Sequence, residues 1–536
     1  MLTVTQALEL AVRHHRAGEL EPAERIYRAV LRIDPQHAGV RYNLGNVLQK
    51  RSRFDEAIEH YRAAISLAPH DSTAHRVLGT AFKAQGNLGA AISSYRSAIA
   101  LRPDYAEAHN NLGNAYLDLG DIDSAIRCFR SAVDCRSDSA DFRFNLSNAL
   151  QRADRLDDAE QAIRGALQFR PSDPDLHNSL GILQFDQGRV DSAIASYEAA
   201  ISINPHHIRA RYNRSLAWLL QGKWSQGWPE YEWRHRLHST AAASFVRAWR
   251  GERRPDATLL IDTEQGLGDT IQFARFIAQA RERIGRVIVR APSTMRALLL
   301  RIDGVDEFST EDATVPTHDY RIALLSLPGI FGVTPENVPR HPYLQAERGR
   351  TEFWRQTLAA VRGLRIGIQW QGNPNQPKDR YRSFPLREFA PLAETSGVNL
   401  ISLQKGAGSE QLREATFKVS DIGSLLNETD SAFMETAAVI SNLDLVITAD
   451  TSIAHLAGAL GVRTWIPVSA VPEWRWLLDR EDTPWYRSAR LFRQTTRGKW
   501  SDVFRRIREA LQKELAGHAA TAIEHATTTC EEDHRC

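Results

Sequence analysis

Cysteine is scarce in this 536-residue sequence: there are four, and no two of them form a C-x-x-C pair. So few cysteines in a long chain exclude a disulfide framework and a zinc site of recognised spacing. Long apolar runs are also missing, since stretches such as 298–300 are far shorter than the roughly 20 residues of a membrane span. Residues 1–11 lack a basic region followed by an apolar core. We therefore expect a cytoplasmic protein without a secretory signal or an integral membrane segment.

Neither sign of charge is in excess. The chain has 67 Lys and Arg against 65 Asp and Glu, and a formal net charge of +2. This balance gives no indication of a nucleic-acid partner or a membrane surface. The hydrophobic share of 43% and the charged share of 25% are typical of globular proteins. At about 150 residues per domain, the length predicts three or four units, or fewer where one is a repeat array.

A repeat of 34 residues, the spacing of Gly45 and Gly79, runs through the N-terminal half. The small residues of this column are Gly45, Gly79, Gly113, Ser147, Gly181 and Ser215. A second column pairs an alanine with a large residue four positions later, as in Ala57 and Tyr61, and prolines such as Pro69 close most units. Small residues let two antiparallel helices approach, the large residue fills the space between them, and the proline ends the second helix.

One such unit cannot bury its own apolar face, whereas stacked neighbours can, which predicts a right-handed α-solenoid. The pattern resembles the tetratricopeptide repeat (TPR), with six good copies from about residue 4 to 207 and a degenerate seventh to about 241. We assign residues 4–241 to a TPR array. In the seventh unit Gly227 replaces the alanine and Arg234 replaces a small residue, so we expect this unit to dock onto the next domain.

The resemblance to TPR proteins implies a groove that binds a polypeptide or protein partner. Asparagines recur at one repeat position, namely Asn43, Asn111, Asn145 and Asn213. An asparagine amide both donates to and accepts from a peptide backbone whatever the peptide sequence. Asparagine is also common at this position in TPR proteins of every function, so a peptide-binding role and a packing role both stay open.

After residue 255 the pattern changes to short apolar runs that alternate with helical stretches, which is typical of an α/β fold. The expected strands are 258–262, 286–290, 320–325, 365–370, 399–403, 443–448 and 464–468. A helix at 351–361 separates the first three strands from the others. The sequence therefore predicts two doubly wound halves, 256–345 and 364–515. After a final helix at 502–515, residues 516–536 are rich in Ala, Thr, Glu and His, and we expect a disordered tail.

A first strand–turn–helix segment carries Gly266, Gly268 and Asp269, ahead of an expected helix at 271–284. The glycines permit a tight turn and close approach of the backbone to a ligand. Ile271 stands where a dinucleotide-binding motif has its third glycine, and the sequence contains no G-x-x-x-x-G-K-[ST] phosphate loop. Both findings argue against a dehydrogenase and a P-loop enzyme.

A second strand–turn–helix segment contains Asp450, Thr451 and Ser452, with His455 one turn later. The start of a helix after a strand presents unpaired N–H groups that favour an anion such as a diphosphate. A well-capped helix without a ligand is the structural alternative. For His455 the alternatives are a hydrogen bond to the donor and a packing role.

Together these segments, over about residues 256–515, resemble inverting glycosyltransferases built from two Rossmann-like halves, the GT-B type. The resemblance is closest to the lipopolysaccharide heptosyltransferases and their bacterial TPR-fused relatives, and the architecture is similar to that of protein O-linked N-acetylglucosamine transferases. Further motifs typical of the fused relatives lie at 367–374, 382–386, 402–406 and 474–476. The heptosyltransferases carry a glycine where this chain has Ser452, so heptose is not implied as the sugar.

The resemblance implies that Asp269 is the catalytic carboxylate and that the segment from Asp450 to His455 binds a nucleotide-sugar donor. We expect Asp269 to act as a general base on the acceptor hydroxyl, with capping of the following helix as the alternative role. No D-x-D pair follows a strand in the second half, so we expect catalysis without a metal or a cofactor. The other donor-binding candidates, each with a packing or surface alternative, are Lys405, Gln404, Arg382, Trp370 and Asn373.

The leading interpretation is a glycosyltransferase that transfers a sugar from a nucleotide-sugar to a hydroxyl acceptor, with the TPR array recruiting a protein or glycan. One alternative is a noncatalytic TPR scaffold with a degenerate nucleotide-binding module. Another is a nucleotide-sugar epimerase or hydrolase on the same architecture.

Overall fold

The computed structural model describes residues 3–237, 247–376, 378–423 and 432–532, with side chains described as far as residue 516. The chain forms two compact units, one of residues 1–187 with 198–205 and the other of residues 188–197 with 206–536. The division runs through α12 (Val190–Ile203), so the second unit already begins inside the repeat array.

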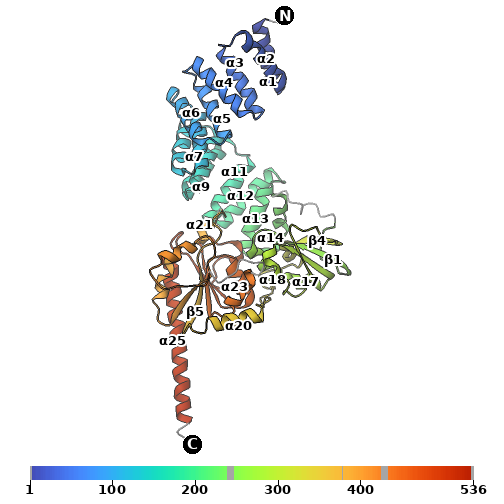
Figure 1. Ribbon diagram of the computed structural model, residues 1–536, viewed down its shortest axis with the longest axis vertical. Helices are drawn as coiled ribbons and strands as arrows, with labels where there is room; N and C mark the ends of the chain where they lie inside the picture. The colour runs from blue at the N-terminus through green and yellow to red at the C-terminus, as the bar shows by residue number, and fades with distance from the viewer. Residues whose placement is uncertain (1–2, 238–246, 377, 424–431, 533–536) are drawn as a thin grey trace. The chain divides into compact units, whose positions relative to one another are not determined.

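The first unit is a stack of antiparallel helix pairs in which each helix contacts the next one along the chain (Figure 1). This arrangement confirms the predicted solenoid. Its helices are α1 (Val4–Arg16), α2 (Leu20–Ile33), α3 (Ala38–Lys50), α4 (Phe54–Leu67), α5 (Ser72–Ala84), α6 (Leu88–Leu101), α7 (Ala106–Leu119), α8 (Ile122–Cys135), α9 (Ala140–Arg152), α10 (Leu156–Phe169) and α11 (Pro174–Asp186).

The small-residue column packs as the sequence predicts. A Cβ atom at Gly45 would lie 2.6 Å from the Tyr61 ring, and one at Gly113 would lie 2.7 Å from the Phe129 ring. Glycine is therefore what lets each aromatic ring lie directly on the facing helix. Where serine replaces glycine, the Ser147 hydroxyl donates a hydrogen bond of 2.8 Å to the carbonyl oxygen of Ala159.

The second unit contains α13 (Ile208–Leu220), α14 (Trp224–Tyr231), α15 (Arg234–Leu237) and two sheets whose strands all pair in parallel. The first sheet has the order β3-β2-β1-β4, and the second has the order β10-β9-β8-β5-β6-β7. The strands are β1 (Arg254–Asp262), β2 (Ile284–Ala291), β3 (Glu307–Thr310), β4 (Tyr320–Ala323), β5 (Leu364–Gln369), β6 (Val398–Ser402), β7 (Ser420–Asp421), β8 (Leu445–Thr448), β9 (Thr464–Val468) and β10 (Ala489–Arg493).

Counted from its own first strand, β5, the second sheet has the order 3-2-1-4-5-6 of the doubly wound nucleotide-binding folds. The predicted strands are all present, whereas β3, β7 and β10 were not expected. The α-helices of this part are α16 (Leu267–Phe273), α17 (Ile277–Arg281), α18 (Arg296–Leu299), α19 (Leu327–Ile330), α20 (Arg348–Thr357), α21 (Asp379–Arg382), α22 (Ala390–Ala393), α23 (Ala432–Ile440), α24 (Ser452–Leu460) and α25 (Ser501–Glu532). The 3-10 helices are η2 (Ala274–Phe276), η3 (Ser293–Met295), η4 (Leu324–Ser326), η5 (Leu386–Phe389), η6 (Ser409–Glu414) and η8 (Trp474–Trp476).

Two helix predictions need correction. The helix expected at 271–284 begins earlier, as α16, and is interrupted by η2 before it ends with α17. Residues 516–532, which were expected to be disordered, continue α25 to Glu532. Extending an existing helix avoids the cost of nucleation, and alanine and glutamate favour the helical state. The last four residues of the expected tail, 533–536, lie outside the described residues.

A cluster of aromatic side chains joins α14 to α16, beside the first sheet, and to η8 and the segment before β10, beside the second sheet. We call Trp224, Trp228, Phe273, Trp474 and Trp485 the tryptophan cluster. The Trp224 and Trp485 rings stack with their centroids 4.8 Å apart, and Trp228 contacts Phe273 at 6.5 Å. The degenerate seventh unit thus docks on the α/β part, as its broken repeat pattern predicts.

Within the described ranges, none of the helices has the length and apolar character that crossing a bilayer requires.

Candidate functional site

The strand order of the second sheet reverses between β5 and β8, and open α/β sheets bind ligands at the carboxyl ends of such strands. Gln369, the last residue of β5, is buried there. Its Oε1 accepts hydrogen bonds from the hydroxyls of Thr448 at 2.8 Å and Thr451 at 2.9 Å. The side chain of Gln369 therefore fixes the turn between β8 and α24, a role that the sequence analysis did not assign.

The turn places Asp450, Thr451 and Ser452 together at the start of α24, as expected. Thr451 is the N-cap, and its hydroxyl oxygen accepts a hydrogen bond of 3.3 Å from the Ile453 N–H. Asp450 is 7% exposed. Burial raises the pKa of its carboxyl group, and the Arg382 guanidinium offsets part of this rise. The well-capped helix that served as the alternative interpretation is therefore present, with a buried acid beside it.

Asp269 lies in the first turn of α16 and has a partner for each carboxylate oxygen. Its Oδ2 accepts a hydrogen bond of 2.8 Å from the Gly266 N–H, so the carboxylate caps its own helix. Its Oδ1 forms an ion pair with Nη2 of Arg475, which belongs to η8 on the side of the second sheet. The capping alternative is thus observed, and the ion pair directs the same carboxylate toward the second half.

The two glycines of this turn lie where the halves meet. A Cβ atom at Gly268 would lie 3.0 Å from the His455 ring and 3.3 Å from Cα of Ser452. The helix α16 therefore packs against α24. A Cβ at Gly266 would lie 3.1 Å from the Asp269 carboxylate. The structure thus brings together Gly266, Gly268 and Asp269 from the first half and Ser452 and His455 from the second.

His455 is held by packing on several sides. Its ring is stacked on Trp476 with an interplanar angle of 11°, and Nδ1 lies 3.0 Å from the Tyr486 hydroxyl oxygen. Burial, together with the guanidinium groups of Arg475 and Arg275, lowers the pKa of His455 well below its usual value. A neutral imidazole follows, and the observed surroundings favour the packing role.

Trp370 and Gln404 hold loops rather than line an open surface. Trp370 is fully buried, and its Nε1–H donates a hydrogen bond of 3.1 Å to the Gly408 carbonyl. This burial leaves no ring face for a base to stack on, so the surroundings of Trp370 favour the packing alternative. The Gln404 amide accepts from the Trp370 N–H at 3.1 Å and donates to the Ala407 carbonyl at 2.7 Å. Through these hydrogen bonds, Trp370 and Gln404 hold together the loops that follow β5 and β6.

The remaining donor-site candidates occupy different surroundings. Arg382, on α21, pairs with the buried Asp379 at 3.1 Å and acts electrostatically on Asp450. Lys405 is half-buried after β6. Asn373 is exposed, and its Oδ1 accepts a hydrogen bond of 3.0 Å from the Asn375 N–H. Of the three, Arg382 is the one that the described interactions connect to α24.

The recurrent asparagines occupy equivalent places in the array. Each is half-buried in the first helix of its pair: Asn43 in α3, Asn111 in α7, Asn145 in α9 and Asn213 in α13. The Asn145 amide donates a hydrogen bond of 2.8 Å to Oδ1 of Asn110. This bond shows that the position also takes part in contacts between neighbouring repeats.

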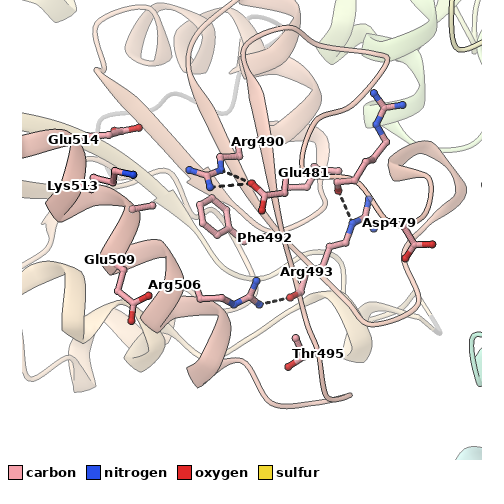
Figure 2. Close-up of a pocket in the computed structure, with 13 residues that line it drawn as sticks. Asp479, Glu481, Arg490, Phe492, Arg493, Thr495, Arg506, Glu509, Lys513 and Glu514 are labelled. Atoms are coloured by element: carbon pink, nitrogen blue, oxygen red, sulfur yellow. Dashed lines mark hydrogen bonds and ion pairs between the residues drawn. The ribbon is translucent and has the colours of Figure 1, made fainter. Parts of the chain in front are cut away.

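A cavity of about 870 Å³ lies beside the edge strand β10, between it and α25 (Figure 2). None of the predicted site residues lines it. Arg490 pairs there with Glu481 at 3.0 Å, while burial lowers the pKa of Arg493 to about 10. Arginines on an edge strand, and glutamates in the neighbouring loop and helix, look like ordinary surface residues in a sequence, so no sequence signal marks this cavity.

The part of the chain that the structure describes has no group of three or more His, Cys, Asp or Glu side chains arranged to hold a metal ion.

Family models for the tetratricopeptide repeat match residues 38–71, 110–174 and 178–226, and a TPR repeat model matches residues 79–120. The N-terminal region therefore contains tetratricopeptide repeats, as predicted. Such repeats point to a protein-interaction scaffold.

Among curated proteins, the chain is similar to Protein FlbA of Caulobacter vibrioides, with 26% identity over 338 residues. The match covers 56% of this chain and 54% of FlbA, so the chain spans about half the length of this relative.

Solved structures of repeat proteins match parts of the chain. YrrB, described as a TPR protein with an unusual peptide-binding site, is 19% identical, covering 35% of this chain and 98% of YrrB with a TM-score of 0.32. The pilF protein of Pseudomonas aeruginosa is 18% identical, covering 39% and 95% with a TM-score of 0.35. A structure of MamA is 26% identical, covering 31% and 98% with a TM-score of 0.29.

Proposed function

We propose that this chain is a metal-independent, inverting glycosyltransferase of the GT-B type that uses a nucleotide-sugar donor. One observation carries the proposal. The first turn of α16, which contains Asp269 and lies beside the first sheet, packs against the start of α24, which lies beside the second sheet. A Cβ atom on Gly268 would lie 3.3 Å from Cα of Ser452, and Arg475 links Asp269 to the second half. At this junction the first sheet contributes an acid, Asp269, and the second contributes the capped start of α24. Such an arrangement suits the transfer of a sugar from a diphosphate.

In the proposed reaction the carboxylate of Asp269 takes the proton of the acceptor hydroxyl while that oxygen attacks the anomeric carbon. The bond from this carbon to the diphosphate oxygen breaks, and the nucleoside diphosphate leaves with the electron pair. Backbone N–H groups at the start of α24, with Arg382 or Lys405 as the cation, are the groups of this chain that would compensate its charge. General base catalysis of this kind supplies roughly 10² to 10⁴ in rate.

The repeat array supports a role in recruiting the acceptor. We propose that it binds a polypeptide, with the asparagines of α3, α7, α9 and α13 as candidate contacts to the peptide backbone. Substitution of Asn111 by alanine should then weaken binding of peptides of many sequences alike, because an amide reads the backbone and not the side chains.

A noncatalytic scaffold is the second candidate, and one observation favours it. His455 is enclosed by Trp476 and Tyr486, and Asp269 is already paired with Arg475. A module that had lost its donor would keep such a closed junction.

Thermal denaturation in the presence of UDP-, ADP- and GDP-sugars separates the two candidates. A donor that binds only the folded protein raises the unfolding temperature, by an amount equivalent to about 2.7 kcal/mol at a hundred times its dissociation constant. A shift with one donor class is expected for the glycosyltransferase, and no shift with any donor supports the scaffold.

Asp269→Asn tests the base directly, because the amide oxygen still accepts from the Gly266 N–H while the basic carboxylate is gone. Turnover should fall by about 10² to 10⁴. Asp319→Asn is a matched control in the same half, since its exposed carboxylate accepts from the Thr258 N–H and lies outside the proposed site. Equal turnover of the two variants would remove Asp269 as the base, and loss of turnover in excess chelator would refute the metal-independent mechanism.

A further inference from the structure

Arg475 is a buried cation where η8 meets α16. It is 6% exposed, and its guanidinium carbon lies 4.4 Å from the centre of the Trp474 ring and 5.6 Å from that of Phe273. A guanidinium packed against two aromatic rings is limited in the directions in which its N–H groups can point.

Each nitrogen of this guanidinium has a defined acceptor. Nε donates to Oε1 of Gln272, Nη1 pairs with Glu473, and Nη2 pairs with Asp269. Gln272 and Asp269 both belong to α16, whereas Glu473 precedes Arg475 in the second half. Burial lowers the pKa of Arg475, but the carboxylates of Glu473 and Asp269 more than compensate and leave it raised. The cation is therefore fixed by side chains of both halves.

This arrangement determines the direction of the Asp269 carboxylate. Oδ2 is anchored by the Gly266 N–H, and Oδ1 is anchored by Arg475. With both oxygens held, the carboxylate has one orientation. With Arg475 removed, only the backbone contact remains, and the side chain is free to rotate about it.

We propose that Arg475 is a positioning residue for Asp269. A side chain of the second half thus sets the orientation of a carboxylate group in the first half. The inference rests on the proposed function, in which Asp269 is the base. A reacting group misplaced by about 1 Å costs on the order of 10² in rate, which sets the size of the expected effect.

Arg275 provides a matched control. It is 5% exposed and also bridges the halves, donating hydrogen bonds of 2.7 Å to the Trp485 carbonyl and 2.9 Å to the Pro339 carbonyl. Its described contacts do not include Asp269. A substitution of Arg275 therefore reports the loss of a buried bridging arginine without the loss of the carboxylate's anchor.

The test compares Arg475→Gln, Arg475→Lys and Arg275→Lys in the full chain. Arg475→Gln should lower kcat about 10²-fold beyond the loss in Arg275→Lys, while the donor KM and the donor-induced thermal shift change less than about threefold. Arg475→Lys keeps the charge without the forked geometry, and its kcat should fall between the two. A kcat for Arg475→Gln within threefold of that for Arg275→Lys would overturn the proposal.

A double substitution separates positioning from a general structural effect. If Arg475 acts through Asp269, then Asp269→Asn combined with Arg475→Gln should have the same kcat as Asp269→Asn alone. Multiplication of the two separate losses contradicts the inference, because it shows that Arg475 acts independently of the carboxylate.

Hydrogen exchange supplies a measurement that needs no turnover. The Gly266 N–H is protected by Asp269, so its exchange should become faster in Arg475→Gln and stay as in the wild type in Arg275→Lys. Equal exchange in both variants overturns the inference. Absence of donor binding by the wild-type chain instead refutes the proposed function, so the two failures are distinguishable.

Discussion

Gly458 lies where α24 packs against the ring of Tyr486. A Cβ atom at this position would lie 2.4 Å from the Tyr486 ring, which is itself fully buried among packed neighbours. Gly458→Ala should therefore lower the free energy of unfolding by about 1–3 kcal/mol, the usual cost of overpacking. Thermal unfolding of the full chain measures the effect.

Gly89→Ala is the control for this change. Gly89 lies in α6, and a Cβ there would meet no atom within 4 Å. This substitution should leave stability unchanged or raise it by up to about 1 kcal/mol, since alanine favours the helix. Equal unfolding temperatures for the two variants would show that the Tyr486 ring gives way easily.

His455 should make stability depend on pH. Its pKa is lowered well below the usual value by burial and by nearby guanidinium groups, so below about pH 6.5 the unfolded chain binds a proton that the folded chain does not. Its contribution to stability is present above that pH and is lost as the pH falls. His455→Phe keeps a ring on Trp476, and it should reduce the slope of unfolding free energy against pH by up to about 1.4 kcal/mol per unit between pH 5 and 6.5. Identical slopes in denaturant titrations of the two proteins would contradict this.

The sequence identifies some of these residues more readily than others. Asp269 and Asp450 follow strands, so the topology of a parallel sheet predicts their place before any coordinates exist. Trp370 also follows a strand, yet packing decides between a buried and an open ring, and the sequence does not contain that information. The contact of Arg475 with Asp269 joins residues 206 positions apart, and its geometry depends on how the two halves fit.

At the scale of single elements, the strands that the sequence does not reveal share one property. The strands β3, β7 and β10 each lie at an edge of their sheet. Central strands are covered on both faces and form apolar runs, whereas edge strands carry polar residues that resemble loops in a sequence. The β10 sequence ARLFR illustrates this, with two arginines among five residues.

Helix α5 offers a test of local sequence control. The Asp71 carboxylate accepts hydrogen bonds from the Thr73 N–H at 2.8 Å and the Ala74 N–H at 3.2 Å. Asp71→Ala should destabilise this helix start by about 0.5–2 kcal/mol, the ordinary range for loss of an N-cap. Faster amide exchange at Thr73 and Ala74, with unchanged exchange in α10, measures the effect. The N-cap of α10, Arg155, has no side-chain capping bond.

At the scale of the whole molecule, the boundaries of the compact units, and not the boundaries of the repeats, predict which fragments fold by themselves. Trp224 and Trp228 of α14 complete the tryptophan cluster with side chains of both halves. Loss of a buried tryptophan side chain costs about 3–5 kcal/mol, and a whole domain is stable by only about 5–15 kcal/mol. A fragment of residues 250–536, which lacks α13 and α14, should therefore fail to fold, whereas residues 188–536 should keep a cooperative transition.

Differential scanning calorimetry of the two fragments checks this prediction. A similar transition in both would show that the α/β part is stable without the last repeat. The repeat period places the end of the array near residue 241 from the sequence alone. The structure adds that the last repeat shares its core with the part that follows, which depends on contacts that no repeat pattern encodes.

The stacked pair of Trp224 and Trp485 has an optical consequence. Its rings lie 4.8 Å apart with an interplanar angle of 25°, close enough for their electronic transitions to couple. Coupled indoles produce an exciton couplet in circular dichroism, a signal that neither ring gives alone. Separation of the pair on addition of a peptide or a nucleotide-sugar would abolish that couplet, so the native chain reports on its own junction without an added label.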